Sequence, residues 1–174
     1  MELLDLYTDE RIRTGMTADR SRPIPEGFYV QVVHICVFDT KGRMLIQQRQ
    51  PFKRGWPGMW DVSVGGCAVA GETSRNAAER ETLEELGLEI DLSNNRAAVT
   101  VNFDHGFDDY YVLSKEPDLS MLKLQPEEVQ AVRWADEHEI LKMIDEGIFI
   151  PYEKSLITLL FTRRNNRSAH SRDR

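Results

Sequence analysis

The chain has few of the features that mark secreted or membrane proteins. Only two of its 174 residues are cysteine, Cys36 and Cys67, which is too few for the disulfide framework of a small secreted domain. No apolar run approaches the roughly eighteen residues of a membrane-spanning helix. The acidic start, Met1–Asp5, lacks the charged-then-apolar pattern of a secretory signal. We therefore expect a cytoplasmic protein with no membrane association.

Basic charge is also scarce. The chain holds 22 Lys and Arg residues against 29 Asp and Glu residues, for a net charge of -7. Proteins that bind nucleic-acid polymers need a basic face for the phosphates, so we expect no such partner. A small anionic ligand held through a metal ion stays compatible with this charge. The apolar content of 41% suits one globular domain with a core.

The pattern of turn residues and charge divides the chain into three parts. Residues 1–27 form an N-terminal arm or hairpin followed by a linker rich in Pro, Gly and Ser. Residues 28–163 carry the alternation of apolar segments expected of the main domain. Residues 164–174 are rich in Arg and lack an apolar pattern, which predicts a disordered tail.

The main domain mixes strands and helices without regular alternation. We predict strands at 28–39, 44–50, 60–64, 97–103, 110–115 and 129–135, and helices from Thr73 or Ser74 to Gly87, at 136–146 and at 151–163. In the last helix, Leu156, Leu159 and Leu160 are expected to face inward. This order favours an α+β domain with a mixed or antiparallel sheet flanked by helices.

Three glutamates on the first of these helices form its most unusual feature. Glu81, Glu84 and Glu85 stand at positions i, i+3 and i+4, a spacing that stacks carboxylates along one flank of a helix. Like charges at this spacing repel each other. The flank is therefore either an ordinary solvated surface or a place where a cation binds. The apolar face is predicted to contain Ala78, Thr82 and Leu86, extended by Ala77 and Leu83.

The segment Gly66–Leu88 resembles the Nudix box of the Nudix hydrolases, G-x5-E-x7-R-E-U-x-E-E-x-G-U, where U is a bulky aliphatic residue. All seven fixed positions match: Gly66, Glu72, Arg80, Glu81, Glu84, Glu85 and Gly87. Chance agreement at roughly one in twenty per position is on the order of 10⁻⁹ for each start position. Thr82 departs from the pattern, since an aliphatic residue is usual there. The stretches 42–49, 60–66 and 127–134 are also similar to the family.

The resemblance implies a fold and a reaction. The fold would be the α+β Nudix fold, a mixed β-sheet sandwiched between α-helices in three layers (α/β/α). The reaction would be Mg²⁺-dependent hydrolysis, with Mn²⁺ as a possible substitute. Its substrate would be a nucleoside diphosphate linked to another moiety X, or a related organic diphosphate.

The resemblance also assigns roles to residues of this chain. Glu81, Glu84 and Glu85 would coordinate the metal together with the backbone carbonyl of Gly65. Glu72 and Arg80 would hold the loop and orient these glutamates. A further carboxylate from a late loop is expected to take part in catalysis. Our choice for it is Glu128, with Glu127 as the alternative.

The identity of X depends on loops outside the box. The candidate substrate-binding residues are Arg49, Lys53, Arg54, Trp56 and His105. Each also has a plainer interpretation, as an exposed basic residue, a packed aromatic or an ordinary loop histidine. A homodimer formed by exchange of the N-terminal arm is possible, but no residue requires it.

Two alternatives to hydrolysis stay open. The stretches 6–15 and 26–29 resemble a branch of Nudix proteins related to isopentenyl-diphosphate isomerase. That isomerase has a catalytic Cys and a metal-binding His where this chain has Gly65 and Cys67, so isomerase-like activity is the second choice. The third is a non-catalytic Nudix binding module, which would be expected to lack one or more box carboxylates. This chain has them all.

Overall fold

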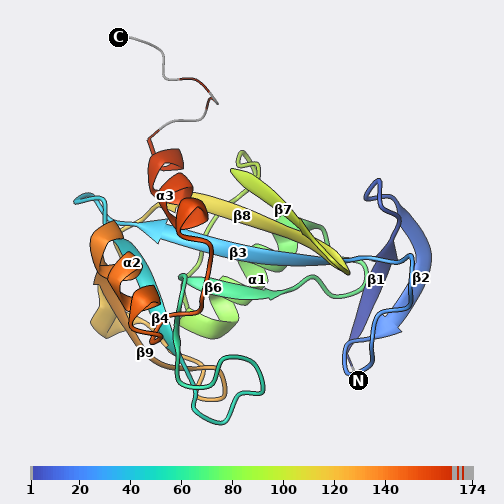
Figure 1. Ribbon diagram of the computed structural model, residues 1–174, viewed down its shortest axis with the longest axis horizontal. Helices are drawn as coiled ribbons and strands as arrows, with labels where there is room; N and C mark the ends of the chain where they lie inside the picture. The colour runs from blue at the N-terminus through green and yellow to red at the C-terminus, as the bar shows by residue number, and fades with distance from the viewer. Residues whose placement is uncertain (1, 166–167, 169, 171–174) are drawn as a thin grey trace.

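Two β-sheets and three α-helices form the described part of the chain (Figure 1). The computed structural model describes residues 2–165, 168 and 170. The predicted disordered tail, 164–174, lies largely outside the described residues. No helix in the described residues is long and apolar enough to cross a membrane.

The N-terminal segment forms a separate two-stranded hairpin. Its strands are β1 (Leu3–Tyr7) and β2 (Arg13–Asp19), and they pair antiparallel. Arg11 lies in the connecting turn before β2, with a φ of 63°. Figure 1 shows the hairpin standing at one end of the main sheet.

The main sheet has seven strands of mixed direction. They are β3 (Val30–Phe38), β4 (Met44–Arg49), β5 (Trp60–Asp61), β6 (Val64–Cys67), β7 (Val99–Phe103), β8 (Gly106–Ser114) and β9 (Val129–Ala135). The order β5-β4-β3-β8-β7 forms the main path, while β6 pairs with β3 and β9 pairs with β4. The long pair β3–β8 is parallel, and the other pairs are antiparallel.

The strand predicted at 60–64 is two strands with different partners. Strand β5 pairs with β4, whereas β6 pairs with β3 and continues through Cys67. Ser63 lies at the crossing between them, where its buried hydroxyl accepts a hydrogen bond from the Val37 amide (2.8 Å) and donates one to the Leu45 carbonyl (2.5 Å). A short apolar run alone does not reveal such a change of partner.

Helices cover both faces of the sheet, which confirms the α/β/α layering. Helix α1 (Ser74–Leu86) packs on the face that includes Val33, Ile35 and Val37 of β3. Helices α2 (Glu137–Asp145) and α3 (Lys154–Arg163) pack on the opposite face, against Cys36 and Phe38. A short 3₁₀ helix, η1, spans Leu119–Met121.

Two of the inward-facing leucines were predicted wrongly. In α3 the buried residues are Ile157, Leu160 and Phe161, while Leu159 is 42% exposed. In α1 Leu83 is 50% exposed. Helical spacing defines a set of candidate faces, and the neighbouring layers decide which of them is covered.

Candidate active site

Local sequence fixes the length and ends of helix α1. The Thr73 hydroxyl accepts a hydrogen bond from the Asn76 amide (3.2 Å), which is the expected N-cap. At the other end Gly87 adopts the left-handed conformation with φ 62°, and its amide donates to the Leu83 carbonyl (2.9 Å). These two caps determine which residues are helical, and the helix geometry then determines on which face each glutamate lies.

The three glutamates of α1 have different environments. Glu81 is 8% exposed and Glu85 is 4% exposed, whereas the Glu84 side chain is 51% exposed. A uniformly solvated acidic flank is therefore excluded. The helix buries two carboxylates and leaves Leu83 in solvent, the reverse of what burial of apolar surface alone would favour.

Gly66 provides the space for Glu81. Strand β6 places Gly66 opposite Val33 of β3, on the face that α1 covers. A Cβ atom at Gly66 would lie 2.2 Å from the Glu81 carboxyl carbon, a distance that real atoms do not tolerate. The glycine of the box is thus needed because the Glu81 carboxyl group lies directly on the strand backbone.

Arg80 joins the preceding loop to the helix. Its Nε and Nη2 atoms donate to the two carboxylate oxygens of Glu72 at 2.7 and 3.0 Å, and Nη2 also donates to the Cys67 carbonyl at 3.1 Å. Its Nη1 atom lies 2.9 Å from Glu84 Oε2 and 3.1 Å from Glu81 Oε1. A planar guanidinium suits such a forked arrangement.

The network around Arg80 stabilises the charged form of Glu72. Partial burial opposes ionisation, but hydrogen bonds from Arg80 and from the Val69 amide outweigh it, so the pKa of Glu72 is below its ordinary value. Glu72 therefore stays an anion that ties the loop to α1. The positioning role of Glu72 and Arg80 stays a prediction.

Glu85 is held on the other side of the cluster. Its Oε2 atom accepts a hydrogen bond from the Gln47 side chain of β4 at 2.9 Å. Burial raises the pKa of Glu85 to about 8, against the opposing effect of that hydrogen bond. Burial also raises the pKa of Glu81, opposed by Arg80 and by Arg20. Burial therefore outweighs the stabilising contacts of both carboxylates.

The loop after Pro126 brings one of the two late carboxylates near this cluster. The Gln125 amide donates to the Glu85 carbonyl (2.9 Å), and the Glu128 amide donates to the Gln125 carbonyl (3.0 Å). The charge of Glu128 contributes to the raised pKa of Glu85, after burial and other effects. Glu127 is exposed. The geometry therefore favours Glu128 over Glu127.

The candidate substrate-binding residues fall into two groups. Around the loop after β4, Lys53 forms an ion pair with Glu128, and Arg49 Nη1 lies 3.7 Å from Asp61 Oδ2. Arg54 is exposed and Trp56 is 49% exposed in the same loop. His105 is exposed in the turn between β7 and β8, and its carbonyl accepts from the Val30 amide. Lys53 is thus joined to the loop beside the box helix through its ion pair with Glu128. The described contact of His105 is with β3.

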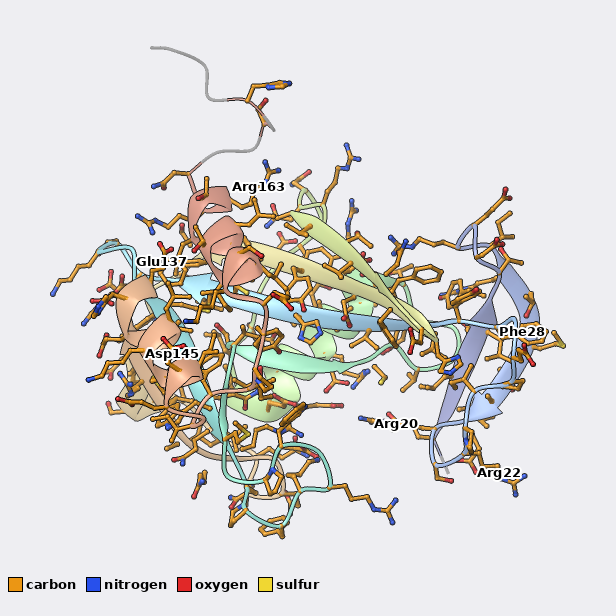
Figure 2. All side chains as sticks on the ribbon, viewed as in Figure 1. Arg20, Arg22, Phe28, Glu137, Asp145 and Arg163 are labelled. Carbon is orange, nitrogen blue, oxygen red and sulfur yellow. The ribbon has the colours of Figure 1, made fainter. Side chains whose placement is uncertain are left out.

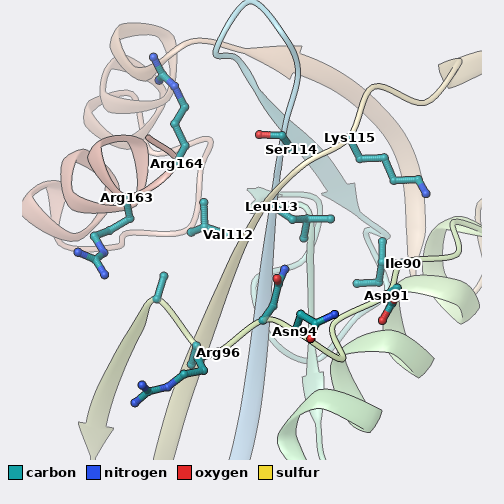
Figure 3. Close-up of a pocket in the computed structure, with 13 residues that line it drawn as sticks. Ile90, Asp91, Asn94, Arg96, Val112, Leu113, Ser114, Lys115, Arg163 and Arg164 are labelled. Carbon is teal, nitrogen blue, oxygen red and sulfur yellow. The ribbon is translucent and has the colours of Figure 1, made fainter. Parts of the chain in front are cut away.

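A hollow of about 840 Å³ lies away from this cluster. It is lined by the loop after α1, the end of β8 and the end of α3. Its basic side chains include Arg96, Lys115 and Arg164, but Figure 3 shows Lys115 and Arg164 extending in different directions.

Comparison with known proteins identifies the family. The model of the NUDIX domain matches residues 28–153, which is most of the chain. The chain belongs to the NUDIX domain family. Members named Nudix hydrolases are close relatives, so the protein is a hydrolase that acts on pyrophosphate bonds.

Similar Nudix proteins span nearly the whole chain. An uncharacterized Nudix hydrolase of Listeria innocua is 45% identical over 170 residues, which cover 98% of this chain and 99% of that protein. An isopentenyl-diphosphate Delta-isomerase of Streptomyces coelicolor is 35% identical over 103 residues, covering 59% of this chain and 51% of that protein. A crystal structure from Deinococcus radiodurans has a TM-score of 0.72 at 25% identity and covers 91% of this chain and 97% of that one.

The Nudix box of this chain offers oxygen ligands that suit a hard divalent cation. Family members generally use divalent metal ions. In the described residues, no three His, Cys, Asp or Glu side chains converge as a ready metal cluster. Glu84 is turned towards Arg80, while Glu81 and Glu85 are buried with raised pKa values. The donor atoms fit the cation, and Glu84 would have to leave Arg80 to join them.

Thr82, the one departure from the Nudix box, is accommodated within the helix. Its side chain is fully buried, and its hydroxyl donates to the Ala78 carbonyl at 2.7 Å. The polar atom is therefore satisfied by the helix itself. The aliphatic position of the box is filled without an unpaired buried group.

Sequence reasoning missed several residues that contact the Nudix box. Gln47 of β4 donates to Glu85. A polar residue in an otherwise apolar strand was the only sign in the sequence that it has a buried partner. Arg13 of the hairpin donates to the Glu72 carbonyl, and nothing in its local sequence points to the box. His34 of β3 is partly satisfied. Its Nε2 lies 3.1 Å from Asp108 Oδ1, but its buried Nδ1 has no hydrogen-bond partner in the described residues.

Proposed function

We propose that this Nudix protein hydrolyses the diphosphate linkage of a nucleoside diphosphate joined to a moiety X, or of a related organic diphosphate, with Mg²⁺ as the metal and Mn²⁺ as a substitute. The observation that supports this most strongly is that Glu81 and Glu85 are both buried on α1, with pKa values that burial raises. Burial disfavours the charged form of a carboxylate. A bound divalent cation would remove that penalty.

When bound, Mg²⁺ would polarise the phosphate oxygens and place or acidify the attacking water. Glu81, Glu84, Glu85 and the Gly65 carbonyl would hold it. Arg80 would keep the Glu81 carboxyl group on the Gly66 backbone while Glu84 changes partner. Glu72 would hold the loop through its two hydrogen bonds from Arg80.

Glu128 would act on the attacking water. Its carboxylate pairs with Lys53 and lies on the loop that is bonded to the C-terminal end of α1. A carboxylate at this place can accept a proton from water as a general base. When Glu128 accepts the proton it loses its negative charge, and Lys53 would then be free to contact a substrate phosphate.

Substrate selection would come from the loop after β4 and the turn before β8. Arg49, Lys53 and Arg54 provide cations for phosphate, and Trp56 provides an exposed ring on which a base could stack. His105 would contact the X moiety from the β7–β8 turn. The identity of X is not implied by these residues.

An isomerase activity on isopentenyl diphosphate is the second candidate, supported by the named relatives. In this chain Gly65 has no thiol, and a Cβ atom at this position would lie 3.2 Å from His34 Nδ1. Cys67 follows two residues later in β6, and burial raises the pKa of its thiol. A raised pKa disfavours the thiolate, so hydrolysis is the stronger candidate.

The proposal is tested with a substrate panel in ¹⁸O-labelled water containing Mg²⁺, with products identified by mass spectrometry. The panel contains nucleoside di- and triphosphates, ADP-ribose, coenzyme A and isopentenyl diphosphate. We expect metal-dependent cleavage of at least one diphosphate, with the label on the attacked phosphorus. Conversion of isopentenyl diphosphate to its dimethylallyl isomer without cleavage would establish the second candidate instead.

A further inference from the structure

A buried carboxylate links the N-terminal hairpin to the helix of the Nudix box. Asp109 of β8 is 3% exposed. Its Oδ2 atom accepts hydrogen bonds from the Arg11 guanidinium of the hairpin turn at 2.8 Å and from the Ser74 hydroxyl at 2.7 Å. Its Oδ1 atom accepts a hydrogen bond from the Thr100 hydroxyl at 2.6 Å. Because Ser74 is the first residue of α1, the hairpin and the box helix are bonded to the same carboxylate oxygen.

The surroundings of Arg11 hold its side chain in this contact. Its Nη2 atom also donates to Gln31 Oε1 at 2.7 Å, and its guanidinium lies 5.0 Å from the centre of the Phe107 ring. Its backbone is left-handed, with a φ of 63°, a conformation that is unfavourable for a residue with a long side chain. The side-chain contacts offset this strain. Loss of the Arg11 side chain would leave the Asp109 carboxylate buried without this cation, which is costly.

The hairpin also contacts the loop that leads into α1. The Ala70 amide donates to the Leu3 carbonyl at 2.8 Å, and the Gly71 amide donates to Asp5 Oδ2 at 2.8 Å. Strand β1 is therefore bonded directly to the box loop. The turn of the hairpin is bonded to the start of the box helix through Asp109.

The position of α1 on the sheet has little tolerance. Asp109 lies opposite Val33 of β3, and Val33 lies opposite Gly66 of β6, so Asp109 and Gly66 belong to one row across the sheet. From Ser74 to Glu81 the helix rises by about 10 Å. The Glu81 carboxyl group lies on the Gly66 backbone, where a Cβ atom would be only 2.2 Å away. A displacement of the helix at Ser74 would therefore also displace the Glu81 carboxyl group.

We propose that Arg11, Asp109 and Ser74 are positioning residues, through which the N-terminal hairpin holds the metal-binding glutamates of α1 in place. This inference rests on the proposed function, because it takes Glu81 and Glu85 as the metal ligands. The three positioning residues act by fixing the start of α1. If their role were only structural, their loss would lower the stability of the fold and leave metal binding by the folded protein unchanged.

The experiment measures the affinity of the full chain for Mn²⁺ by electron paramagnetic resonance, under conditions in which each variant is folded. The test variants are Arg11→Gly, Ser74→Ala and the double variant. Glycine at position 11 removes the side chain and also relieves the left-handed backbone, which limits the loss of stability. Ile140→Val is the control for stability, because Ile140 is fully buried in the core on the opposite face of the sheet. Arg22→Gln is the control for charge, since Arg22 is exposed and Figure 2 shows its side chain pointing away from the main domain.

We expect Arg11→Gly and Ser74→Ala each to bind Mn²⁺ about tenfold more weakly, as is typical when residues that orient metal ligands are lost. The double variant should lose less affinity than the product of the two single losses, because both residues act through Asp109. Ile140→Val and Arg22→Gln should bind Mn²⁺ as the unchanged protein does. Unchanged affinity in Arg11→Gly would overturn the inference, and so would an equal loss in Ile140→Val.

Amide hydrogen exchange of the metal-free protein tests the same positioning without the metal. Residues 70–78 should exchange faster in Arg11→Gly than in the unchanged protein, whereas both controls should leave their exchange unaltered. Faster exchange confined to the hairpin would overturn the inference, because the start of α1 would then be held without Arg11. If the unchanged protein bound Mn²⁺ but cleaved nothing in the ¹⁸O panel, the proposed function would fail, and the comparison of Mn²⁺ affinities would still decide the inference.

Discussion

Gln47 of β4 donates a hydrogen bond from Nε2 to Oε2 of Glu85 on α1, at 2.9 Å, and both side chains are buried. This contact joins the sheet to the helix that carries the Nudix box. It fixes one carboxylate oxygen of Glu85 and leaves the other without a hydrogen bond in the described contacts. A neutral donor does not balance the buried charge, which is why the pKa of Glu85 stays high at about 8.

Glu85→Gln is expected to remove hydrolysis while leaving the fold intact. An amide keeps a hydrogen-bonding group beside Gln47 but is a poor ligand for Mg²⁺. Loss of several kcal/mol of charge stabilisation predicts a fall in kcat/KM of roughly 10³-fold. Glu89→Gln, on the exposed stretch after the helix, is the matched control. Near-normal turnover by Glu85→Gln, measured beside its Mn²⁺ affinity, would contradict the metal assignment.

The metal-free protein should lose stability as the pH rises. Glu85 has a folded pKa of about 8, above the value of roughly 4.3 in an unfolded chain, so the folded state binds its proton more tightly. Stability from this group is full below about pH 4 and is lost progressively up to about pH 8. Urea unfolding in chelator at pH 5 and pH 8 measures the change. The decline should be smaller in Glu85→Gln, and an equal decline in both would assign it to other groups.

Gly66→Ala is expected to displace Glu81. The added methyl would meet the Glu81 carboxyl group at 2.2 Å, whereas at Gly65 the nearest atom is His34 Nδ1 at 3.2 Å. We expect Gly66→Ala to lose about 1–3 kcal/mol of stability and to bind Mn²⁺ more weakly. Gly65→Ala, compared by the same thermal unfolding and titration, should be milder. Equal effects of the two variants would show that the position of Glu81 is not what Gly66 provides.

Arg80 and Glu72 are expected to act as a coupled pair. Their two hydrogen bonds of 2.7 and 3.0 Å are partly buried. A double-mutant cycle with Arg80→Gln and Glu72→Gln should give a coupling of about 0.5–3 kcal/mol in urea unfolding. Additive effects would mean that the pair does not hold the loop on α1.

The two late carboxylates should differ in their effect on turnover. Glu128 pairs with Lys53 and influences Glu85, while Glu127 is exposed. If Glu128 is the general base, Glu128→Gln should lower kcat by about 10²- to 10⁴-fold, and Glu127→Gln should leave it near normal. The reverse order would make Glu127 the catalytic residue.

Features that depend on neighbouring residues in the chain were predictable from sequence. Thr73 and Gly87 mark the ends of α1, and Asp136 caps α2, because caps are formed within a few residues. Strand β9 has the predicted bounds, Val129–Ala135. The Nudix box was also recognisable, since its residues occupy fixed positions along one loop and one helix.

Features that depend on contacts between distant segments were decided by the tertiary structure. The glutamate spacing is compatible with a solvated flank, and only the packing of α1 on β3 and β6 buries Glu81 and Glu85 while exposing Leu83. The hydrogen bond from Gln47 to Glu85 joins positions far apart in the chain. The sequence by itself therefore determined the chemical groups of the site and the helix that carries most of them. The three-dimensional packing decided which of those groups are buried and which of them interact. Burial and electrostatic interaction depend on distance in space and not on distance along the chain.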